Sequence, residues 1–329
     1  MMTQIRIAIA GYGNLGRGAE AAIKQSPDMR LVSVFSRRDP ASVTLLDSSV
    51  PVYAMDDIEQ YQNDIDVLLL CGGSKSDLPE QGPQLAGLFN IVDSFDTHAK
   101  IPEYFTALDA PAKSAGKVAL LSVGWDPGLF SLNRLYGEAI LPVGETYTFW
   151  GKGLSQGHSD AVRRVAGVKS GVQYTIPSES AMARVRNGEQ PTLSTREKHT
   201  RECFIVLADG ADAEAVRSTI VNMPDYFSDY DTTVNFIDAH TFSEQHSSMP
   251  HGGFVIRSGV SGSDNAKQVL EFSLKLGSNP GFTSSVLVAY ARAAYKMNQA
   301  GETGAKTVLD VAPGLLSPKT PAELRKELL

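Results

Sequence analysis

The sequence predicts an α/β protein with two domains, a doubly wound parallel sheet followed by an α+β domain whose sheet is largely antiparallel. Three observations support this prediction. The 329 residues suffice for about two hydrophobic cores. Short apolar segments alternate with helical segments up to about residue 124. Beyond residue 125, the segments alternate apolar and polar residues, which is typical of antiparallel strands with one solvated face.

The first domain, predicted to span residues 1–124, begins with the apolar segment Ile5–Ala10, which predicts a buried strand. The segment Arg17–Ser26 is then expected to be helical. Four further short apolar strands are predicted, separated by helical stretches, and this succession indicates a parallel sheet covered on both faces. These strands are Leu31–Ser36, Asp66–Cys71, Asn90–Phe95 and Val118–Val123.

The second domain is predicted to span residues 125–301. A long helix is expected near its end, from about Thr283 to Gln299, and Gly301 closes it because glycine readily adopts the left-handed backbone found at helix C-termini. Residues 302–329 are predicted to return to the first domain and to end in a short amphipathic helix. The predicted strands of the second domain are the alternating segments 146–154, 169–176, 202–208, 233–238 and 252–259.

The composition is that of a soluble globular protein, with 42% hydrophobic and 20% charged residues. The net charge of -7 provides no broad basic surface, so nucleic acid and anionic membranes are poor candidate partners. Cys71 and Cys203 both lie in apolar segments and are expected to be reduced and buried. The N-terminal residues lack the apolar segment of a signal peptide, and we expect a cytoplasmic protein.

A glycine-rich turn follows the first predicted strand. Gly11, Gly13 and Gly16 form a G-x-G-x-x-G pattern that directly precedes a helix. The first glycine permits a tight turn, the second the close approach of a pyrophosphate, and the third close packing of helix on strand. The alternative is an ordinary tight strand-to-helix turn. The context favours a Rossmann-type sheet that binds a dinucleotide.

Ser36, Arg37 and Arg38 end the second predicted strand. An acidic residue at this place binds a free ribose 2′-hydroxyl but repels a 2′-phosphate. Here a hydroxyl and two guanidinium groups are available to bind the phosphate, and one guanidinium can stack on the adenine. The alternative is two solvated surface arginines. The sequence therefore predicts NADP rather than NAD as the cofactor.

Other cofactor contacts are expected where the third and fourth predicted strands end, because ligands of open parallel sheets bind at the carboxyl ends of the strands. The full set of predicted cofactor-binding residues is Gly11, Tyr12, Gly13, Asn14, Leu15, Gly16, Ser36, Arg37, Arg38, Cys71, Gly72, Gly73, Ser74, Ser94, Phe95 and Asp96.

Four segments combine polar side chains with glycine or tryptophan and are candidates for the chemistry. Taken singly, their aspartates are more often structural than catalytic, and Asp93 is expected to cap or turn the chain. Asp96 and Asp126 together, at two strand ends beside a cofactor, indicate a site that receives an amine. A helix is expected to start at Ser159 or Asp160. The four segments are 92–98, 123–128, 149–160 and 247–254.

Two other chemistries are disfavoured. The spacing of His240, His246 and His251 does not suit a metal site on one helix face. Cys71 could be a thiol nucleophile, but no activating partner is evident beside it. We therefore expect no metal and no thiol catalysis.

Nine stretches that run through nearly the whole chain resemble the meso-diaminopimelate D-dehydrogenase family, in the order found in that family. The long ones are specific, because chance does not produce "GLSQGHSDA" together with "MPHGG". The stretches are "GYGNLGR", "FSRR", "GWDPG", "FWGKGLSQGHSDA", "VQYTIPSE", "MPDYF", "VNFID", "MPHGG" and "VAPGLLSP".

The resemblance implies an NADP-dependent, reversible oxidative deamination of the D-centre of meso-2,6-diaminopimelate in lysine and diaminopimelate biosynthesis. The products are L-2-amino-6-oxopimelate, which cyclises to tetrahydrodipicolinate, ammonia and NADPH. It also implies a homodimer in which residues 125–301 bind the substrate and form the dimer. Two alternatives remain: an NADP-dependent dehydrogenase of another substrate, such as other D-amino acids, and a non-enzymatic NADP-binding sensor.

The resemblance further implies Asp96 and Asp126 as catalytic residues that hold the D-ammonium group. Arg201 is expected to clamp the distal carboxylate, because a guanidinium binds a carboxylate with two hydrogen bonds. Lys152 is expected to be solvated. The implied substrate contacts are Asp96, Asp126, Trp150, Gln156, Gly157, Thr175, Arg201, His251 and Asn279.

Overall fold

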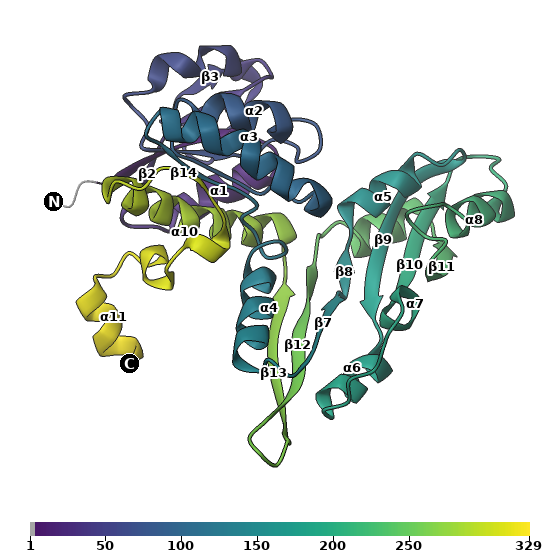
Figure 1. Ribbon diagram of the computed structural model, residues 1–329. Helices are drawn as coiled ribbons and strands as arrows, with labels where there is room; N and C mark the ends of the chain where they lie inside the picture. The colour runs from purple at the N-terminus through teal and green to yellow at the C-terminus, as the bar shows by residue number, and fades with distance from the viewer. Residues whose placement is uncertain (1–3) are drawn as a thin grey trace. The chain divides into compact units, whose positions relative to one another are not determined.

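The computed structural model describes residues 4–329 as two compact units, and each has its own sheets and core (Figure 1). Unit 1 comprises the chain up to Leu132 together with Pro280–Leu329, and unit 2 comprises Asn133–Asn279. The C-terminal segment thus belongs with the N-terminal part, as the sequence predicts. The boundaries differ from the predicted ones, since unit 1 also includes most of the long helix α10 (Asn279–Gln299).

Unit 1 contains a sheet of seven parallel strands in the order β14-β6-β5-β4-β1-β2-β3. All five predicted strands are present, most of them shorter than predicted. Two short edge strands, β3 and β14, were not predicted because each has only three residues. The strands are β1 Ile5–Ala10, β2 Met29–Ser36, β3 Val52–Ala54, β4 Val67–Leu70, β5 Ile91–Asp93, β6 Val118–Leu120 and β14 Gly304–Lys306.

Helices cover both faces of this sheet. They are α1 Asn14–Lys24, α2 Leu78–Ala86, α3 Ile101–Ser114 and α10, and the C-terminal helix α11 (Pro321–Leu328) follows them. Short 3-10 helices occupy Pro40–Ser42, Met55–Tyr61, His98–Lys100, Val308–Asp310 and Pro313–Leu316.

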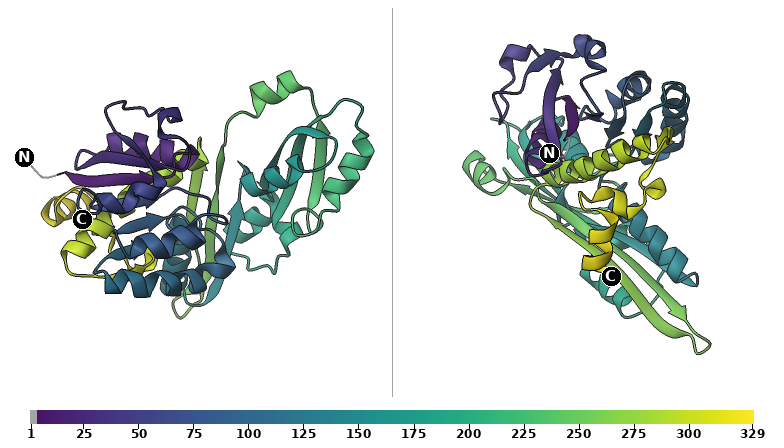
Figure 2. Two further views of the ribbon diagram at one scale, coloured as in Figure 1. Left: turned by 90° about the horizontal axis from the view of Figure 1, so that it is seen from above. Right: turned by 90° about the vertical axis from the view of Figure 1, so that its left-hand side faces the viewer.

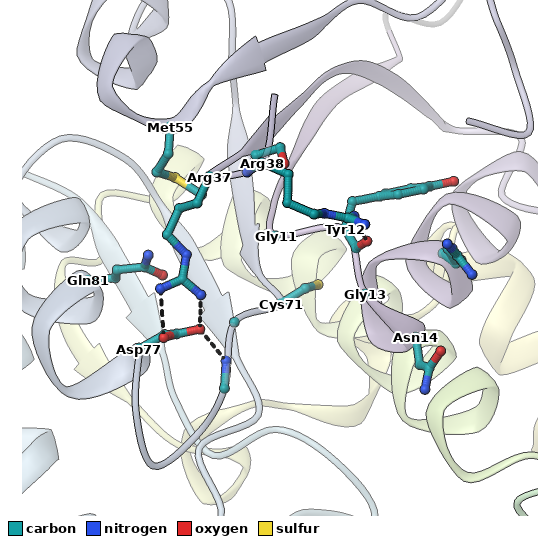
Figure 3. A pocket seen from close by; sticks show the side chains of 14 residues that line it. Gly11, Tyr12, Gly13, Asn14, Arg37, Arg38, Met55, Cys71, Asp77 and Gln81 are labelled. Atoms are coloured by element: carbon teal, nitrogen blue, oxygen red, sulfur yellow. Dashed lines mark hydrogen bonds and ion pairs between the residues drawn. The ribbon is translucent and has the colours of Figure 1, made fainter. Parts of the chain in front are cut away.

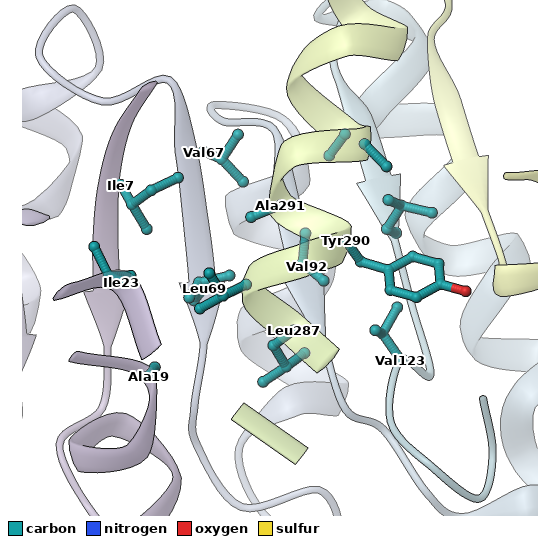
Figure 4. Packing of buried hydrophobic residues seen from close by; sticks show 14 of the residues in the cluster. Ile7, Ala19, Ile23, Val67, Leu69, Val92, Val123, Leu287, Tyr290 and Ala291 are labelled. Carbon is teal, nitrogen blue, oxygen red and sulfur yellow. The ribbon is translucent and has the colours of Figure 1, made fainter. Parts of the chain in front are cut away.

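Successive residues of the central strands enter two different cores, because side chains of a strand alternate between its faces. Ile7 and Ile9 of β1 pack in one core with α1 and α10, and Ala8 and Ala10 pack in the other with α2 and α3. Figure 4 shows Leu287 and other α10 residues beside the strands on the first face. This packing explains why α10 belongs to unit 1.

Unit 2 contains two sheets instead of the single one predicted. The first has the order β11-β10-β9-β8, with β10 and β11 parallel and the other pairs antiparallel. The second is antiparallel, in the order β13-β12-β7, and Figure 2 shows β12 and β13 as a long hairpin. The strands are β7 Gly144–Trp150, β8 Gly153–Leu154, β9 Val168–Pro177, β10 His199–Leu207, β11 Asp231–Phe236, β12 His251–Ser261 and β13 Ala266–Leu276.

The helix predicted to start at Ser159 or Asp160 instead begins at Gln156, so that prediction is wrong. Ser155 precedes the first turn of this helix, α5 (Gln156–Arg163), and the Ser159 hydroxyl donates to the Ser155 carbonyl. Asp160 pairs with Arg163 within the helix and is not a cap. The remaining helices are α4 Leu129–Ile140, α6 Glu179–Arg186, α7 Thr195–Lys198, α8 Ala213–Val221 and α9 Ala239–Gln245.

None of the helices within residues 4–329 is long and apolar enough to span a membrane. Cys71 and Cys203 are both free thiols and both buried, as the sequence predicts.

Candidate functional site

The glycine-rich turn joins β1 to α1 in unit 1. Gly11 has a φ of +97°, and a Cβ atom there would lie 3.1 Å from the carbonyl carbon of Cys71. A Cβ on Gly16 would lie 2.3 Å from the carbonyl oxygen of Gly11, so the helix packs too closely for any side chain. A Cβ on Gly13 would meet nothing within 4 Å. The turn thus packs tightly against the protein at Gly11 and Gly16. At Gly13 it has open space, where a ligand can approach the backbone.

A cavity of about 380 Å³ lies over this turn (Figure 3). Ten of the predicted cofactor-binding residues line it: Gly11, Tyr12, Gly13, Asn14, Ser36, Arg37, Arg38, Cys71, Gly72 and Gly73. Four further lining residues were not predicted: Arg17, Met55, Asp77 and Gln81.

The other six predicted residues, Leu15, Gly16, Ser74, Ser94, Phe95 and Asp96, do not line this cavity. The Phe95 ring is buried and stacks on Tyr104 with the ring centroids 4.3 Å apart, so its side chain is unavailable to a cofactor. Asp96 is exposed, and its backbone N–H donates to the Ser74 hydroxyl at 2.9 Å. This hydrogen bond joins the loops that follow β4 and β5.

Tyr12 forms part of the cavity wall and is fixed by a buried carboxylate. Its hydroxyl donates to Glu20, whose other oxygen accepts the backbone N–H of Asp47 at 2.8 Å. Burial and the hydrogen bond to Glu20 raise the pKa of Tyr12 to about 12. Tyr12 is therefore a neutral, fixed wall of the cavity. Cys71 is similarly unreactive, because burial raises the pKa of its thiol to about 12.

Asp93 ends β5 and is fully buried. One of its carboxylate oxygens accepts the backbone N–H groups of Phe95 and Ser122 at 2.9 and 3.0 Å, and the other accepts the Tyr104 hydroxyl at 2.8 Å. Asp93 thus turns the chain, as predicted. It also connects the loop that carries Asp96 to the segment that leads to Asp126.

Three residues lie side by side across the four-stranded sheet of unit 2, and two of them, Thr175 and Arg201, are predicted substrate contacts. Gly153 of β8 lies opposite Thr175 of β9, which in turn lies opposite Arg201 of β10. The Arg201 guanidinium donates to the Thr175 hydroxyl, and its central carbon lies 3.9 Å from the centroid of the Tyr230 ring.

Arg201 is a buried cation without an anionic partner. Only 7% of its surface is exposed, its Nε atom has no hydrogen-bond partner, and within residues 4–329 it forms no ion pair with a carboxylate. Burial lowers the pKa of Arg201. A buried charge without a partner is costly, so this arrangement favours a ligand that carries an anion.

Three histidines surround this charge, and all are held neutral. Burial, assisted by the charge of Arg201, lowers the pKa of His158 and of His199 to about 4, and both effects also lower the pKa of His251. The His251 ring lies against Gly153, where a Cβ would come within 2.5 Å of it. The positive charge of this region therefore rests with Arg201.

His199 was missed by the sequence analysis. Its Nε2 atom accepts the backbone N–H of Trp150 at 2.8 Å, and the two rings stack with centroids 5.3 Å apart. His199 lies two residues before Arg201 on β10, so the strand periodicity places both on one face. Because Arg201 was already a predicted site residue, the two-residue alternation of its strand is the signal that could have identified His199.

The remaining predicted substrate contacts lie at the ends of helices and strands, with Trp150 ending β7 and Asn279 beginning α10. Gln156 and Gly157 begin α5, whose first backbone N–H groups are available to an anion; the Gln156 side chain lies outside the described part of the structure. Trp150 is 37% exposed, and the backbone N–H of Asn279 donates to the Met249 carbonyl at 2.9 Å. Lys152 is exposed, as predicted.

Comparison with known proteins identifies the family. Residues 124–278 match the family model of the diaminopimelic acid dehydrogenase C-terminal domain. The meso-diaminopimelate D-dehydrogenase of Lysinibacillus sphaericus is 67% identical over 100% of both chains. This chain belongs to the meso-diaminopimelate D-dehydrogenase family. The Corynebacterium glutamicum member of the family is 50% identical over 97% of each chain.

Solved structures of family members share the fold. Diaminopimelate (DAP) dehydrogenase of C. glutamicum in complex with DAP has a TM-score of 0.91 and 49% identity, covering 100% of both chains. An engineered D-amino acid dehydrogenase bound to NADP+ has a TM-score of 0.86 and 47% identity, covering 99% of this chain and 100% of that one. The family and fold predicted from the sequence are thereby confirmed.

The burial of Asp93 makes stability depend on pH. Burial raises the pKa of Asp93 from 3.8 to about 6, so the folded protein holds this proton more tightly than the unfolded chain. Its stabilising contribution is complete below pH 4 and is lost as the pH rises through 6. An Asp93→Asn variant has no such titration.

We therefore expect the free energy of unfolding of the unsubstituted protein, relative to Asp93→Asn, to fall by about 2 kcal/mol between pH 4 and pH 7. Urea unfolding of both proteins at a series of pH values measures the difference. A difference that is constant with pH would contradict this account of Asp93.

Proposed function

We propose that this chain catalyses the reversible oxidative deamination of the D-centre of meso-2,6-diaminopimelate with NADP. The products are L-2-amino-6-oxopimelate, which cyclises to tetrahydrodipicolinate, ammonia and NADPH, and the reaction belongs to lysine and diaminopimelate biosynthesis. The observation that carries the proposal is Arg201, a buried guanidinium without a carboxylate partner in residues 4–329, in a chain that belongs to this family.

NADP fits the cavity of unit 1. The turn at Gly13 is open to a pyrophosphate, and Ser36, Arg37 and Arg38 line the same cavity with groups that can bind a 2′-phosphate. When bound, NADP+ supplies the acceptor for the hydride that leaves the D-carbon of the substrate.

Asp96 and Asp126 are proposed to bind the D-ammonium group. Only a neutral amine can release a hydride from its carbon, so one carboxylate takes a proton from the ammonium before the transfer. Asp93 supports this step, because its hydrogen bonds to Phe95 and Ser122 fix the chain that leads to both carboxylates. Water then attacks the oxidised carbon and ammonia leaves.

Two further groups of residues are proposed to bind the carboxylates of the substrate. Arg201, assisted by Thr175, His251 and Asn279, binds the one at the L-centre. Trp150 and the backbone N–H groups of Gln156 and Gly157 at the start of α5 bind the one at the D-centre. Fixing both ends of the substrate selects which hydrogen faces the nicotinamide, and so selects the D-centre.

A related structure supports this assignment. A mutant of the Clostridium tetani enzyme with six substitutions, solved with DAP, is 54% identical with a TM-score of 0.93 and covers 99% of this chain and 100% of that one. Its substituted residues are a glutamine, a threonine, an arginine, a proline, a histidine and an asparagine, in that order. This chain carries the same residue types in the same order at Gln156, Thr175, Arg201, Pro250, His251 and Asn279.

We propose that the protein is a homodimer in the cytoplasm. Helix α4 and the residues after it expose large apolar side chains, at Leu135, Tyr136, Ile140 and Val143, and a second copy of the chain would cover them. The two free buried thiols fit a reducing compartment.

The dimer can be tested by placing a charge within this surface. Ile140 is 63% exposed, so Ile140→Glu should leave the monomer folded while burying a carboxylate in the dimer interface. We expect the parent protein to sediment as a dimer and the variant as a monomer. A monomeric parent would contradict the proposed dimer.

The proposed reaction predicts a strict choice of isomer. We expect NADPH formation with meso-diaminopimelate, none with the LL isomer, which lacks a D-centre, and little with the DD isomer, whose distal centre fits the clamp poorly. NAD+ should be a poor substitute. Absorbance at the NADPH band, measured with each isomer and each cofactor, gives the result.

Other outcomes of this measurement would favour the alternatives. Equal activity with D-amino acids that lack a distal carboxylate would indicate a broader dehydrogenase. Retained NADP binding without turnover of any isomer would indicate a sensor.

The clamp predicts the effect of removing Arg201. Arg201→Ala should weaken binding of diaminopimelate by roughly 2–5 kcal/mol, the usual cost of removing one partner of a buried charged pair. The KM for NADP should change little. Arg196→Ala, which removes an exposed arginine of α7, is the matched control. An unchanged KM for diaminopimelate in Arg201→Ala would remove Arg201 from the site.

A further inference from the structure

We propose that the two arginines of the cofactor cavity have different tasks. Arg38 distinguishes NADP from NAD, whereas Arg37 is held by Asp77 and supports the binding of both cofactors. The inference rests on the proposed function only in taking a nicotinamide dinucleotide as the ligand. It assigns Asp77, which the sequence analysis did not single out, as a positioning residue.

The Arg37 guanidinium forms an ion pair with Asp77 through its two terminal nitrogen atoms. Its Nη1 and Nη2 atoms donate to the two carboxylate oxygens of Asp77 at 3.0 and 2.7 Å (Figure 3). The Asp77 side chain is only 9% exposed, while that of Arg37 is 64% exposed. A two-bond pair of this kind fixes the plane of the guanidinium as well as its position.

Asp77 also fixes the loop that follows β4. The carboxylate oxygen that accepts Nη2 of Arg37 accepts the backbone N–H of Gly73 at 2.8 Å as well. A Cβ on Gly72 would lie 2.9 Å from the Cβ of Asp77, so the loop packs directly on this side chain. Asp77 therefore joins the end of β2 to a second wall of the same cavity.

The charge of Arg37 is largely neutralised by this pairing. Burial raises the pKa of Asp77, but hydrogen bonds from Gly73, Ser76 and Arg37 outweigh burial and hold the pKa below its ordinary value, so the carboxylate is ionised. A 2′-phosphate that approached Arg37 would also meet the negative charge of Asp77. The Arg37–Asp77 pair therefore adds little net attraction for a phosphate dianion.

Arg38 retains its charge. Its Nη2 atom donates to the Tyr12 carbonyl at 2.6 Å, a neutral acceptor, and within residues 4–329 it forms no ion pair with a carboxylate. Its backbone N–H donates to the Ser36 hydroxyl at 3.0 Å, which leaves the hydroxyl proton of Ser36 for a ligand oxygen. Arg38 and Ser36 together thus present a net positive charge and a donor to a 2′-phosphate.

Arg37 contributes to a part of the ligand that both cofactors share. Met55 and Arg37 both line the cavity (Figure 3), and a guanidinium fixed in its plane offers a flat face to an adenine ring. Adenine is identical in NAD and NADP. Losing Arg37 or Asp77 should therefore weaken both cofactors alike.

The test compares the variants Arg37→Gln, Arg38→Gln and Asp77→Asn by their dissociation constants for NADP+ and NAD+ from calorimetric titration. We expect Arg38→Gln to lower the preference for NADP+ by at least about tenfold, the factor for roughly one charge-assisted hydrogen bond. Arg37→Gln and Asp77→Asn should weaken both cofactors by similar factors and leave the preference nearly unchanged. Arg30→Gln, an exposed arginine of β2 outside the cavity, is the matched control.

The inference is overturned if Arg37→Gln or Asp77→Asn lowers the preference for NADP+ as much as Arg38→Gln does. Thermal unfolding of each variant identifies any that fails to fold, and Arg37→Met and Arg38→Met then give the same comparison, because methionine also removes the charge. Because the titrations need no diaminopimelate, they decide this question even if the proposed reaction is wrong.

Discussion

The proposed substrate site depends on one buried charge, the guanidinium of Arg201, which has no carboxylate partner within residues 4–329. Such a group costs free energy in the folded protein unless an anion completes it. The β-sheet register holds it in place by aligning Thr175 and Arg201 on neighbouring strands. Burial, assisted by the same charge, keeps the nearby histidines neutral, so they can donate or accept hydrogen bonds without adding charge. In the proposed complex, a substrate carboxylate supplies the anion that Arg201 lacks within residues 4–329.

The cofactor unit uses buried carboxylates in the opposite way. Glu20, Asp77 and Asp93 each accept a hydrogen bond from a residue distant in sequence, namely Asp47, Arg37 and Ser122. Each therefore fixes backbone instead of binding a ligand. In unit 1 the carboxylates position the walls of the cavity and the loops that carry Asp96 and Asp126. The three hydrogen-bonded carboxylates thus position the backbone, whereas the unpaired guanidinium of Arg201 is proposed to bind a ligand. Both roles follow from the free-energy cost of burying a charged group.

Much of the cavity in unit 1 could be predicted from the sequence, because most of the residues that indicate it lie close together in short segments of the chain. The glycine turn follows an apolar strand directly, and Ser36 ends the next strand with Arg38 two residues after it. The role of Asp77 could not be predicted, because Asp77 contacts Arg37 only when the fold brings the start of α2 beside the end of β2. Phe95 stays a predicted cofactor contact through its backbone, because its ring is buried and stacks on Tyr104.

Unit 2 was less predictable from the sequence, because its features also depend on contacts that form only in the folded protein. The start of α5 was placed at Ser159 or Asp160, although Ser155 precedes it and Asp160 serves an ion pair. Strand β13 was missed, because most of its residues are solvated and it pairs only with β12. The residues of the proposed clamp were inferred from the resemblance, but the burial of Arg201 and its link to His199 through the strand face required the structure.

A crystal structure with NADP+ and meso-diaminopimelate tests the central claim most directly. We expect the L-centre carboxylate to accept hydrogen bonds from the Arg201 guanidinium, including its Nε atom, with the D-carbon next to the nicotinamide. A distal carboxylate bound elsewhere, with Arg201 left without an anion, would contradict it.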